Sequence, residues 1–254
     1  MKIQYASDLH LEFPENKEFF KRNPLLPGGD VLLLAGDIVP FAVMDKHDDF
    51  FNYVSDTFET TYWIPGNHEY YYSDISEKSG SLNETIRSNV FLVNNCSVKH
   101  ESVNLIFSTL WSEISPANHW QIEQGISDFH VIKYNGNRFS SEQFNQLNHE
   151  SISFLREVLH HTCTGKRIVI SHHVPTFLNY PRKFKMDKLS EAFVVELSDL
   201  IEDSGPGYWI YGHSHHNTKD FSVGETQLLT NQLGYIRNNE QIGYHNGKII
   251  DMFK

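Results

Sequence analysis

Five short polar motifs in this chain contain residue types that bind metal ions. They are Asp8-Leu9-His10, Gly36-Asp37, Gly66-Asn67-His68-Glu69, His172-His173 and Gly212-His213-Ser214-His215. Together they offer carboxylate and amide oxygens and imidazole nitrogens without any thiolate, a donor set that suits Mn, Fe, Zn or Ni better than a sulfur-bound metal. Two such ions held close together can drive an in-line attack on phosphorus. The motifs therefore predict a two-metal site.

Each motif follows an apolar run that is typical of a buried strand, at residues 3–6, 31–35, 62–64, 168–170 and 208–211. In open α/β sheets, ligands gather beyond the carboxyl ends of the strands, so the five motifs are expected to converge in space. Taken singly, an Asp-x-His or a Gly-Asp has an ordinary structural explanation, so the inference depends on the ordered set.

The spacing inside the motifs also favours shared binding. Along an extended chain, side chains two residues apart point to the same side, so Asp8 and His10 are expected to present two ligand atoms to one place. The same holds for His213 and His215. Glycine directly precedes three motif residues, namely Asp37, Asn67 and His213. A residue without Cβ lets the backbone turn sharply out of a strand and lets a metal or phosphate come close.

The ordered set resembles the calcineurin-like metallophosphoesterase superfamily, with motifs spread from Asp8 to His215. The resemblance implies an α/β fold, a four-layer αββα sandwich of two mixed β-sheets flanked by helices, with a dinuclear metal site at the carboxyl ends of strands. It also implies seven metal ligands: Asp8, His10 and His215 for one ion, Asn67, His172 and His213 for the second, and Asp37 bridging both. Two divalent transition-metal ions are expected, with manganese supporting activity.

The same resemblance assigns roles to three further residues. His68 is expected to be catalytic without being a ligand, and Glu69 to orient a neighbouring imidazole through a hydrogen bond. Val174 stands where many family members carry proline. His173 is therefore kept as the substitute for His172 and as a candidate substrate contact.

The chemistry that follows is hydrolysis of a phosphoester. Two cations bridge a hydroxide, lower its pKa and hold the phosphoryl oxygens during attack, and His68 protonates the leaving oxygen or stabilises its charge. A phosphodiester substrate is favoured over a monoester. Two alternatives stay open, a non-catalytic protein-interaction scaffold on the same fold and a nuclease subunit with a basic partner. Scaffolds tend to lose ligands, whereas every ligand position is filled here.

Two branches of the superfamily fit this chain poorly. Serine/threonine protein phosphatases continue the Gly-Asp motif into an Asp-Arg-Gly that contacts substrate phosphate, whereas Asp37 is followed here by Ile38-Val39-Pro40. Purple acid phosphatases place a tyrosine ligand where Pro40 stands. Cyclic-nucleotide phosphodiesterases and small-molecule phosphoesterases share all five motifs.

The acidic balance of the chain bears on its substrate. The formal net charge is −11, whereas a protein that binds extended nucleic acid needs a basic face. We expect a small-molecule phosphoester, nucleotides included, and no obligate protein partner. A basic loop after the fourth motif either binds an anionic substrate group or is simply solvated, and contains Arg182, Lys183, Lys185 and Lys188. The long segment 115–139 either forms an aromatic lid or packs onto the body.

Length and composition fit one metallophosphoesterase domain over residues 1–254. No stretch approaches the roughly 18 continuous apolar residues of a membrane span. The chain enters directly on a strand that carries the first ligands, so no signal peptide is expected. Cys96 and Cys163 lack CxxC spacing and are expected to be free thiols in a reducing compartment. These features indicate the cytoplasm.

Apolar periodicity predicts three helices, around residues 50–58, 144–159 and 193–201. Ser140 and Gln143 can form a capping box at the start of the second. Further strands are predicted at residues 90–93, 105–110, 227–230 and 249–253.

Overall fold

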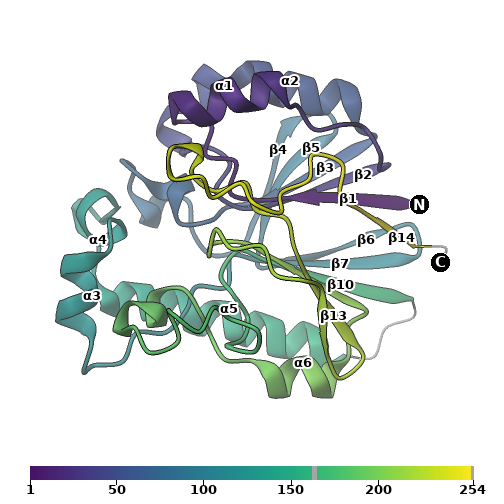
Figure 1. The fold of residues 1–254 in the computed structure, drawn as a ribbon. Coiled ribbons are helices and arrows are strands. Elements are labelled where there is room, and N and C mark those ends of the chain that lie inside the picture. The colour runs from purple at the N-terminus through teal and green to yellow at the C-terminus, as the bar shows by residue number, and fades with distance from the viewer. Residues whose placement is uncertain (162–164, 253–254) are drawn as a thin grey trace.

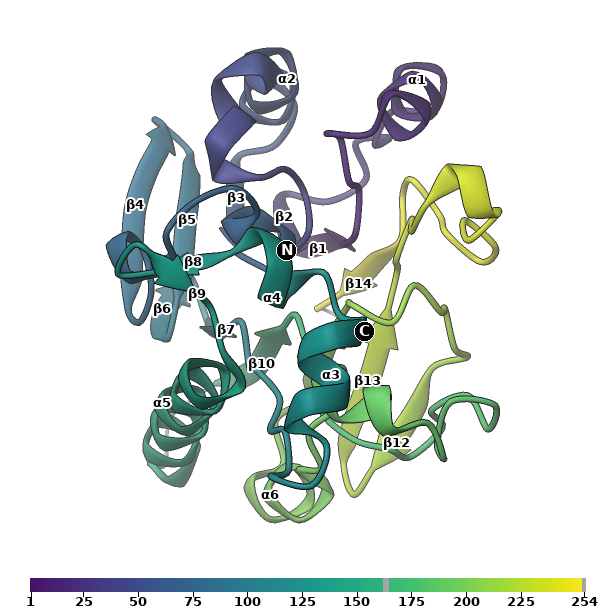
Figure 2. The same cartoon turned by 90° about the vertical axis from the view of Figure 1, so that its left-hand side faces the viewer.

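Two six-stranded β-sheets pack face to face in the middle of the molecule, and helices cover both outer faces (Figure 1). This computed structural model describes residues 1–161 and 165–252. The predicted fold class is confirmed, because both sheets are mixed and lie between helical layers. Figure 2 shows the same molecule from its left-hand side, toward which β1 runs from the N-terminus.

The first sheet has the strand order β14-β1-β2-β3-β5-β4. Its strands are β1 (Lys2–Ala6), β2 (Val31–Ala35), β3 (Thr60–Ile64), β4 (Leu82–Arg87), β5 (Val90–Asn94) and β14 (Ile249–Asp251). Strands β1, β2, β3 and β5 are parallel, and the two edge strands run antiparallel to their neighbours. The carboxyl ends of β1, β2 and β3 therefore lie side by side.

The second sheet has the strand order β12-β13-β11-β10-β7-β6. Its strands are β6 (Cys96–His100), β7 (Val103–Ser108), β10 (Lys166–Ser171), β11 (Tyr208–Tyr211), β12 (Phe221–Val223) and β13 (Thr226–Thr230). The four inner strands are parallel and the two edge strands antiparallel. Strands β10 and β11, which precede the last two motifs, are neighbours.

Side chains alternate between two cores along the inner strands. In β2, Val31, Leu33 and Ala35 belong to the core between the sheets, while Leu32 and Leu34 belong to the core beneath the helices. Because both faces of the strand are buried, its sequence is continuously apolar and does not alternate with polar residues. The same double burial explains why five motifs are each preceded by an apolar run.

Different helices cover the two sheets. Helices α1 (Pro14–Arg22) and α2 (Asp48–Thr57) cover the first, and α5 (Ser141–His160) and α6 (Ser198–Ser204) cover the second (Figure 1). Helix α5 buries Phe144, Leu147, Leu155 and Leu159, as its periodicity predicts, and begins with the expected capping box. The sequence therefore predicts both the extent of α5 and the capping box at its start.

A smaller group of elements lies beyond the carboxyl ends of the strands. It contains α3 (His119–Gly125), α4 (Asp128–Val131) and a two-stranded ribbon of β8 (Lys133–Tyr134) and β9 (Asn137–Arg138). Single 3₁₀ segments complete the fold: η1 (Phe41–His47), η2 (His68–Tyr70), η3 (Ile75–Glu77), η4 (Lys188–Ala192) and η5 (Ile236–Asn238).

The helix expected at residues 193–201 is shorter than predicted. Helix α6 begins only at Ser198, because the residues before it pair with the loop after β10. Val195 N–H donates to Val174 O, and Leu197 N–H donates to Pro175 O. This pairing leaves Phe193 outside any helix, where its ring stacks on His213 at a centroid distance of 4.6 Å.

The predicted strand ends and cysteine states can be compared with the structure only where residues are described. Strand β7 ends at Ser108, short of the predicted Leu110, and β14 ends at Asp251. Phe253 and Cys163 lie outside the described residues. Cys96 is a free thiol. Among the described helices, none combines the length and apolar character that crossing a bilayer requires.

The capping box at the start of α5 gives a stability prediction. Replacing Ser140 with alanine leaves the Gln143 N–H without its acceptor and should lower the free energy of unfolding by about 1 kcal/mol in urea denaturation. Ser153→Ala, on the exposed face of the same helix, is the matched control. An equal loss in both variants would show that the cap contributes nothing.

Candidate metal centre

The five motifs converge between the carboxyl ends of the two sheets. The first sheet contributes Asp8 and His10 after β1, Asp37 after β2, and Asn67 and His68 after β3. The second contributes His172 after β10 and His213 and His215 after β11. All of these residues are buried except His215, which is partly exposed. The expected convergence of the motifs is therefore found.

The backbone that carries these residues is not extended, contrary to the reasoning from spacing. Five of them have positive φ, a conformation that costs a residue with a Cβ about 1 kcal/mol or more. They are Asp8 (56°), His10 (48°), Asp37 (56°), His213 (71°) and His215 (47°). Asp8 with His10, and His213 with His215, still lie at one site. They reach it through sharp backbone turns and not through the alternation of side chains along an extended strand.

One group of acceptors surrounds the end of β1. It consists of Asp8, His10, Asp37 and His215, which each offer a ligand atom within 4.8 Å of the others. His10 Nε2 lies 2.9 Å from His215 Nε2 and 3.7 Å from Asp37 Oδ2. His215 Nε2 lies 3.4 Å from Asp8 Oδ1.

A second group lies on the other side of the same aspartate. Asp37, His172 and His213 again offer atoms within 4.8 Å of one another. His172 Nε2 lies 3.3 Å from Asp37 Oδ1, 3.1 Å from His213 Nδ1 and 3.2 Å from Asn67 Oδ1. Asp37 is thus the residue common to both groups, with one carboxylate oxygen toward each.

The orientation of the imidazoles tests whether a cation fits here. His172 Nδ1 donates to Ala35 O at 2.9 Å, so its other nitrogen is the one directed at Asp37. His215 Nδ1 donates to Glu240 Oε2 at 2.6 Å, which likewise directs Nε2 inward. Imidazoles held in this way by an outer carbonyl or carboxylate are typical of metal ligands.

The charges of the site also require a positive partner. Burial disfavours a charged His172, yet Asp37 raises the pKa of this imidazole to about 9. Burial opposes a charge on His215 too, while Asp8 and Glu240 raise its pKa to about 10. In both groups the carboxylates therefore attract positive charge to a point where several lone pairs meet. A divalent cation in each group satisfies them, so the residues fit two metal ions.

Glycine allows this close approach at two positions. A Cβ on Gly36, where φ is +87°, would lie 2.4 Å from His172 Nδ1, and one on Gly66 would lie 2.2 Å from Asp37 Oδ1. Both distances are too short for any side chain. The groups that come close at these two glycines are the side chains of His172 and Asp37, and the approach of a metal or phosphate stays a prediction.

Glu69 has a different partner from the one expected. It was predicted to orient an imidazole, but its carboxylate accepts from the backbone N–H groups of Gly66 (2.6 Å), Ile38 (2.7 Å) and Asp37 (2.9 Å). It also accepts from Trp63 Nε1 at 3.1 Å. Glu69 is fully buried and ties the loop after β2 to the loop after β3. Its four donors occupy both carboxylate oxygens, which leaves no described imidazole among its hydrogen-bond partners.

His68 lies at the edge of the two groups of acceptors. Its Nδ1 is 3.0 Å from Glu12 Oε1, and its Nε2 is 3.0 Å from the Tyr235 hydroxyl. Its ring stacks on Tyr71 at 4.0 Å. Burial works against an ionised Glu12, but hydrogen bonds from His10 and His68 bring the pKa of the carboxyl down to about 2. The ionised Glu12 can only accept, so His68 Nδ1 donates and Nε2 faces Tyr235.

Four side chains that hydrogen-bond the expected ligands or His68 were not predicted from the sequence, namely Glu12, Asp128, Tyr235 and Glu240. Asp128 accepts from Asn67 Nδ2 at 2.8 Å, which directs the amide oxygen of Asn67 toward His172. Glu12 had a signal, since it extends Asp8-Leu9-His10 by two residues. The other three lie in segments without any motif.

None of the candidate substrate contacts lines a cavity at the centre. His173 is fully buried between Trp111 and His213, and burial together with His172 lowers the pKa of its imidazole to about 3. The structure thus brings His172, and not His173, to Asp37. The basic side chains of the loop that follows are exposed and border neither cavity at the site, namely those of Arg182, Lys183, Lys185 and Lys188.

Two adjoining cavities open at the centre. The inner one, of 190 Å³, is bordered by Asp37, Asn67 and His213, and the outer one, of 550 Å³, by Glu12 and Arg237. They share a wall formed by His68, Tyr71, Ser127 and Tyr235. The inner and outer cavities are therefore neighbours, with His68 at their boundary.

The segment 115–139 borders the inner cavity at four consecutive residues. Its residues there are Gly125, Ile126, Ser127 and Asp128. Its aromatic side chains lie elsewhere: Phe129 is fully buried against Phe139, and Trp120 is 77% exposed. The segment therefore covers part of the site, but not as an aromatic lid.

Comparison with known proteins agrees with this geometry. The family model described as calcineurin-like phosphoesterase matches residues 1–217. The chain belongs to this family. Its members depend on a dinuclear metal centre, and membership makes the chain a hydrolase of phosphoester bonds.

Individual relatives span nearly the whole chain. Uncharacterized protein L509 of Acanthamoeba polyphaga mimivirus is 32% identical over 92% of this chain and 91% of its own length. The crystal structure of Phosphopantetheinyl Hydrolase from Mycobacterium tuberculosis matches 96% of this chain and 93% of its own with a TM-score of 0.71. At 14% identity this likeness shows the fold alone. A dimetal phosphatase from Danio rerio covers 91% of this chain and 87% of its own, with 14% identity and a TM-score of 0.38.

The contacts of Glu69 predict a large effect of its removal. Glu69→Ala leaves four buried N–H donors without an acceptor and should lower the free energy of unfolding by about 3–5 kcal/mol. Urea denaturation followed by circular dichroism measures the change. The exposed Glu77→Ala is the control, and similar stability of the two variants would contradict the role of Glu69.

Proposed function

We propose that this protein is a two-metal phosphoesterase that hydrolyses a small phosphodiester. The observation that carries the proposal is the pair of acceptor groups on either side of the buried Asp37 carboxylate. Mn, Fe, Zn or Ni suits the mixed oxygen and nitrogen donors, and Mn is the ion we expect to support activity.

The distances between donor atoms assign each proposed ligand to one of the two sites. Asp8, His10 and His215 would hold one ion, Asn67, His172 and His213 would hold the other, and Asp37 would contribute to both sites. When bound, the two ions supply a nucleophile from water at neutral pH and neutralise charge on the phosphoryl oxygens. The protein keeps its ligands oriented through Glu12, Asp128, Glu240 and the Ala35 carbonyl.

His68 is proposed to act on the leaving oxygen. It borders both cavities, so it lies beside a phosphoryl group held in the inner cavity, within reach of an ester oxygen of that group. Glu12 holds the proton on Nδ1 and thereby fixes the ring orientation, and Nε2 is the atom that faces the cavity wall beside Tyr235. A proton on Nε2 can pass to the leaving oxygen or stabilise its developing charge.

The lining of the inner cavity supports a diester over a monoester. Asp37 and Asp128 border this cavity, and no lysine or arginine among the described residues does. A monoester brings a second negative charge for which this cavity offers no described lysine or arginine, so the two ions alone would have to offset it, whereas a diester carries only one. The outer cavity offers room for the second ester group.

The direct test is a screen of the purified chain, loaded in turn with Mn²⁺, Fe²⁺, Zn²⁺ and Ni²⁺, against matched aryl mono- and diesters. We expect hydrolysis of both, with the higher kcat/KM for the diester. Preference for the monoester would reverse the substrate assignment. Absence of any hydrolysis in the loaded protein would favour the non-catalytic scaffold instead.

Metal content gives a prediction about Asp37. Elemental analysis should find two transition-metal ions per chain, and chelation should abolish diester hydrolysis until Mn²⁺ is returned. Asp37→Ala should lower occupancy of both sites, because this carboxylate faces both groups, whereas Asn67→Ala should weaken only one. At most one ion per wild-type chain under metal excess would contradict the two-metal proposal.

A second prediction separates catalysis by His68 from metal binding. His68→Ala should keep its metal content while kcat falls roughly 10²- to 10⁴-fold for a poor alkoxide leaving group. The loss should be much smaller for nitrophenolate, which needs no proton. The exposed His149→Ala is the control. Equal losses for both leaving groups would show that His68 positions the substrate and does not protonate it.

A further inference from the structure

The outer cavity has a composition unlike that of the inner one. Its 550 Å³ lie within the range of pockets that hold nucleotide-sized ligands, whereas the inner 190 Å³ can hold little beyond ions and a phosphoryl group. The part of a substrate beyond the scissile phosphate must therefore lie in the outer cavity. Its lining shows what that part carries.

Two cationic side chains border the outer cavity, although the protein as a whole is acidic. Arg237 and Lys46 are both exposed there, and among the described residues neither side chain has a carboxylate or hydrogen-bond partner. Arg237 is nevertheless positioned, because its guanidinium lies over the rings of Phe13 (5.1 Å) and Tyr235 (5.4 Å). Rings fix the plane of the guanidinium while leaving its N–H donors for an anion.

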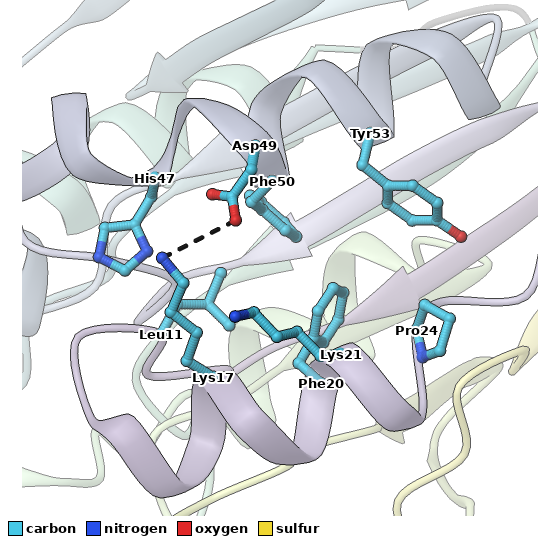
Figure 3. A pocket seen from close by; sticks show the side chains of 9 residues that line it. All are labelled: Leu11, Lys17, Phe20, Lys21, Pro24, His47, Asp49, Phe50 and Tyr53. Carbon is cyan, nitrogen blue, oxygen red and sulfur yellow. Dashed lines mark ion pairs between the residues drawn. The ribbon is translucent and has the colours of Figure 1, made fainter.

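A neighbouring pocket contains a lysine whose charge is paired with a carboxylate. It lies between α1 and α2 and is bordered by Lys17, Lys21 and Asp49, with His47 shared with the outer cavity (Figure 3). There Lys17 Nζ lies 3.8 Å from Asp49 Oδ2. Among the described residues Lys46 and Arg237 have no such carboxylate, which leaves both side chains available to an anionic group of a ligand.

An exposed aromatic side chain completes the mouth of the outer cavity. Tyr72 is 74% exposed, and its backbone has φ +63°, an unusual value for a bulky residue. Its N–H donates to Val131 O, which holds this backbone in place. A tyrosine ring kept in water by a strained backbone is suited to stacking on a planar group.

We propose that the outer cavity binds a nucleotide-like portion of the substrate, with a planar ring stacked on Tyr72 and a second phosphate held by Arg237 and Lys46. The proposal rests on the diesterase function and specifies its substrate class. The charge distribution gives the reason: the inner cavity accepts one singly charged phosphate, and the outer one adds two unpaired cations for another.

Three diesters with the same leaving group test the proposal on the metal-loaded enzyme. They are methyl 4-nitrophenyl phosphate, thymidine 5′-(4-nitrophenyl phosphate) and the 3′-phosphorylated form of the latter. The ratio of kcat/KM for the thymidine diester to that for the methyl diester measures the contribution of the nucleoside ring. The ratio for the 3′-phosphorylated thymidine diester to that for the thymidine diester measures the contribution of the second phosphate. In wild type we expect each ratio to be about 10 or more, the size of one good stacking or charge-assisted contact.

The variants assign each ratio to its residue. Tyr72→Leu should bring the first ratio toward 1, and Arg237→Met or Lys46→Met the second, while Arg237→Lys should keep part of it. Lys21→Met removes a charge from the neighbouring pocket and should change neither ratio. A wild-type ratio near 1, or ratios that survive these substitutions, would overturn the proposal.

A binding measurement separates this proposal from the diesterase function. Calorimetric titration of the metal-loaded protein with the products, thymidine 5′-monophosphate and thymidine 3′,5′-bisphosphate, needs no turnover. We expect the bisphosphate to bind about 10-fold more tightly, and this advantage to disappear in Arg237→Met. If no diester is hydrolysed, the proposed function fails, and equal binding of the two products then rejects the nucleotide subsite as well.

Discussion

The position of the Asp37 carboxylate is the constraint on which the rest of the structure depends. It is 1% exposed, and its two oxygens face different groups of acceptors. A buried carboxylate is stable only with hydrogen bonds and positive charge close by. The His68 N–H supplies a hydrogen bond at 2.9 Å, while His172 lies 3.3 Å from one oxygen and His10 3.7 Å from the other. The two-sheet arrangement is what brings these three histidines to one carboxylate from separate strands.

Much of this could be predicted from the sequence, because an apolar run followed by a polar motif is a local signal. Parallel strands buried on both faces must be apolar throughout, and their carboxyl ends share one edge, so Asp8, Asp37 and Asn67 had to meet. The backbone conformations could not be predicted. Asp8 and His10 lie in the left-handed region, and only tertiary contacts, such as Asp8 N–H to Gly36 O and His10 N–H to Asp37 O, keep them there.

The side chains that contact the motif residues could not be predicted from the sequence for a related reason. Tyr235 and Glu240 follow β13 in an irregular segment, where neither periodicity nor spacing marks a residue. The Phe193 ring meets His213 only because residues 193–197 pair with the loop after β10, a tertiary contact that overrides an apparent helical pattern. Sequence therefore shows which residues converge, and structure shows which ones hold them in place.

The family match ends at residue 217, yet Tyr235, Arg237 and Glu240 approach the centre from the segment after it. Of these, Glu240 accepts a hydrogen bond from a motif imidazole, whereas Arg237 borders the outer cavity and lies over two aromatic rings. The irregular stretch from Tyr235 to Glu240 contains a single 3₁₀ turn and no strand. Mutations that accumulate at its exposed positions over evolution can thus redirect which molecules the cavity accepts while the reactive centre is inherited unchanged.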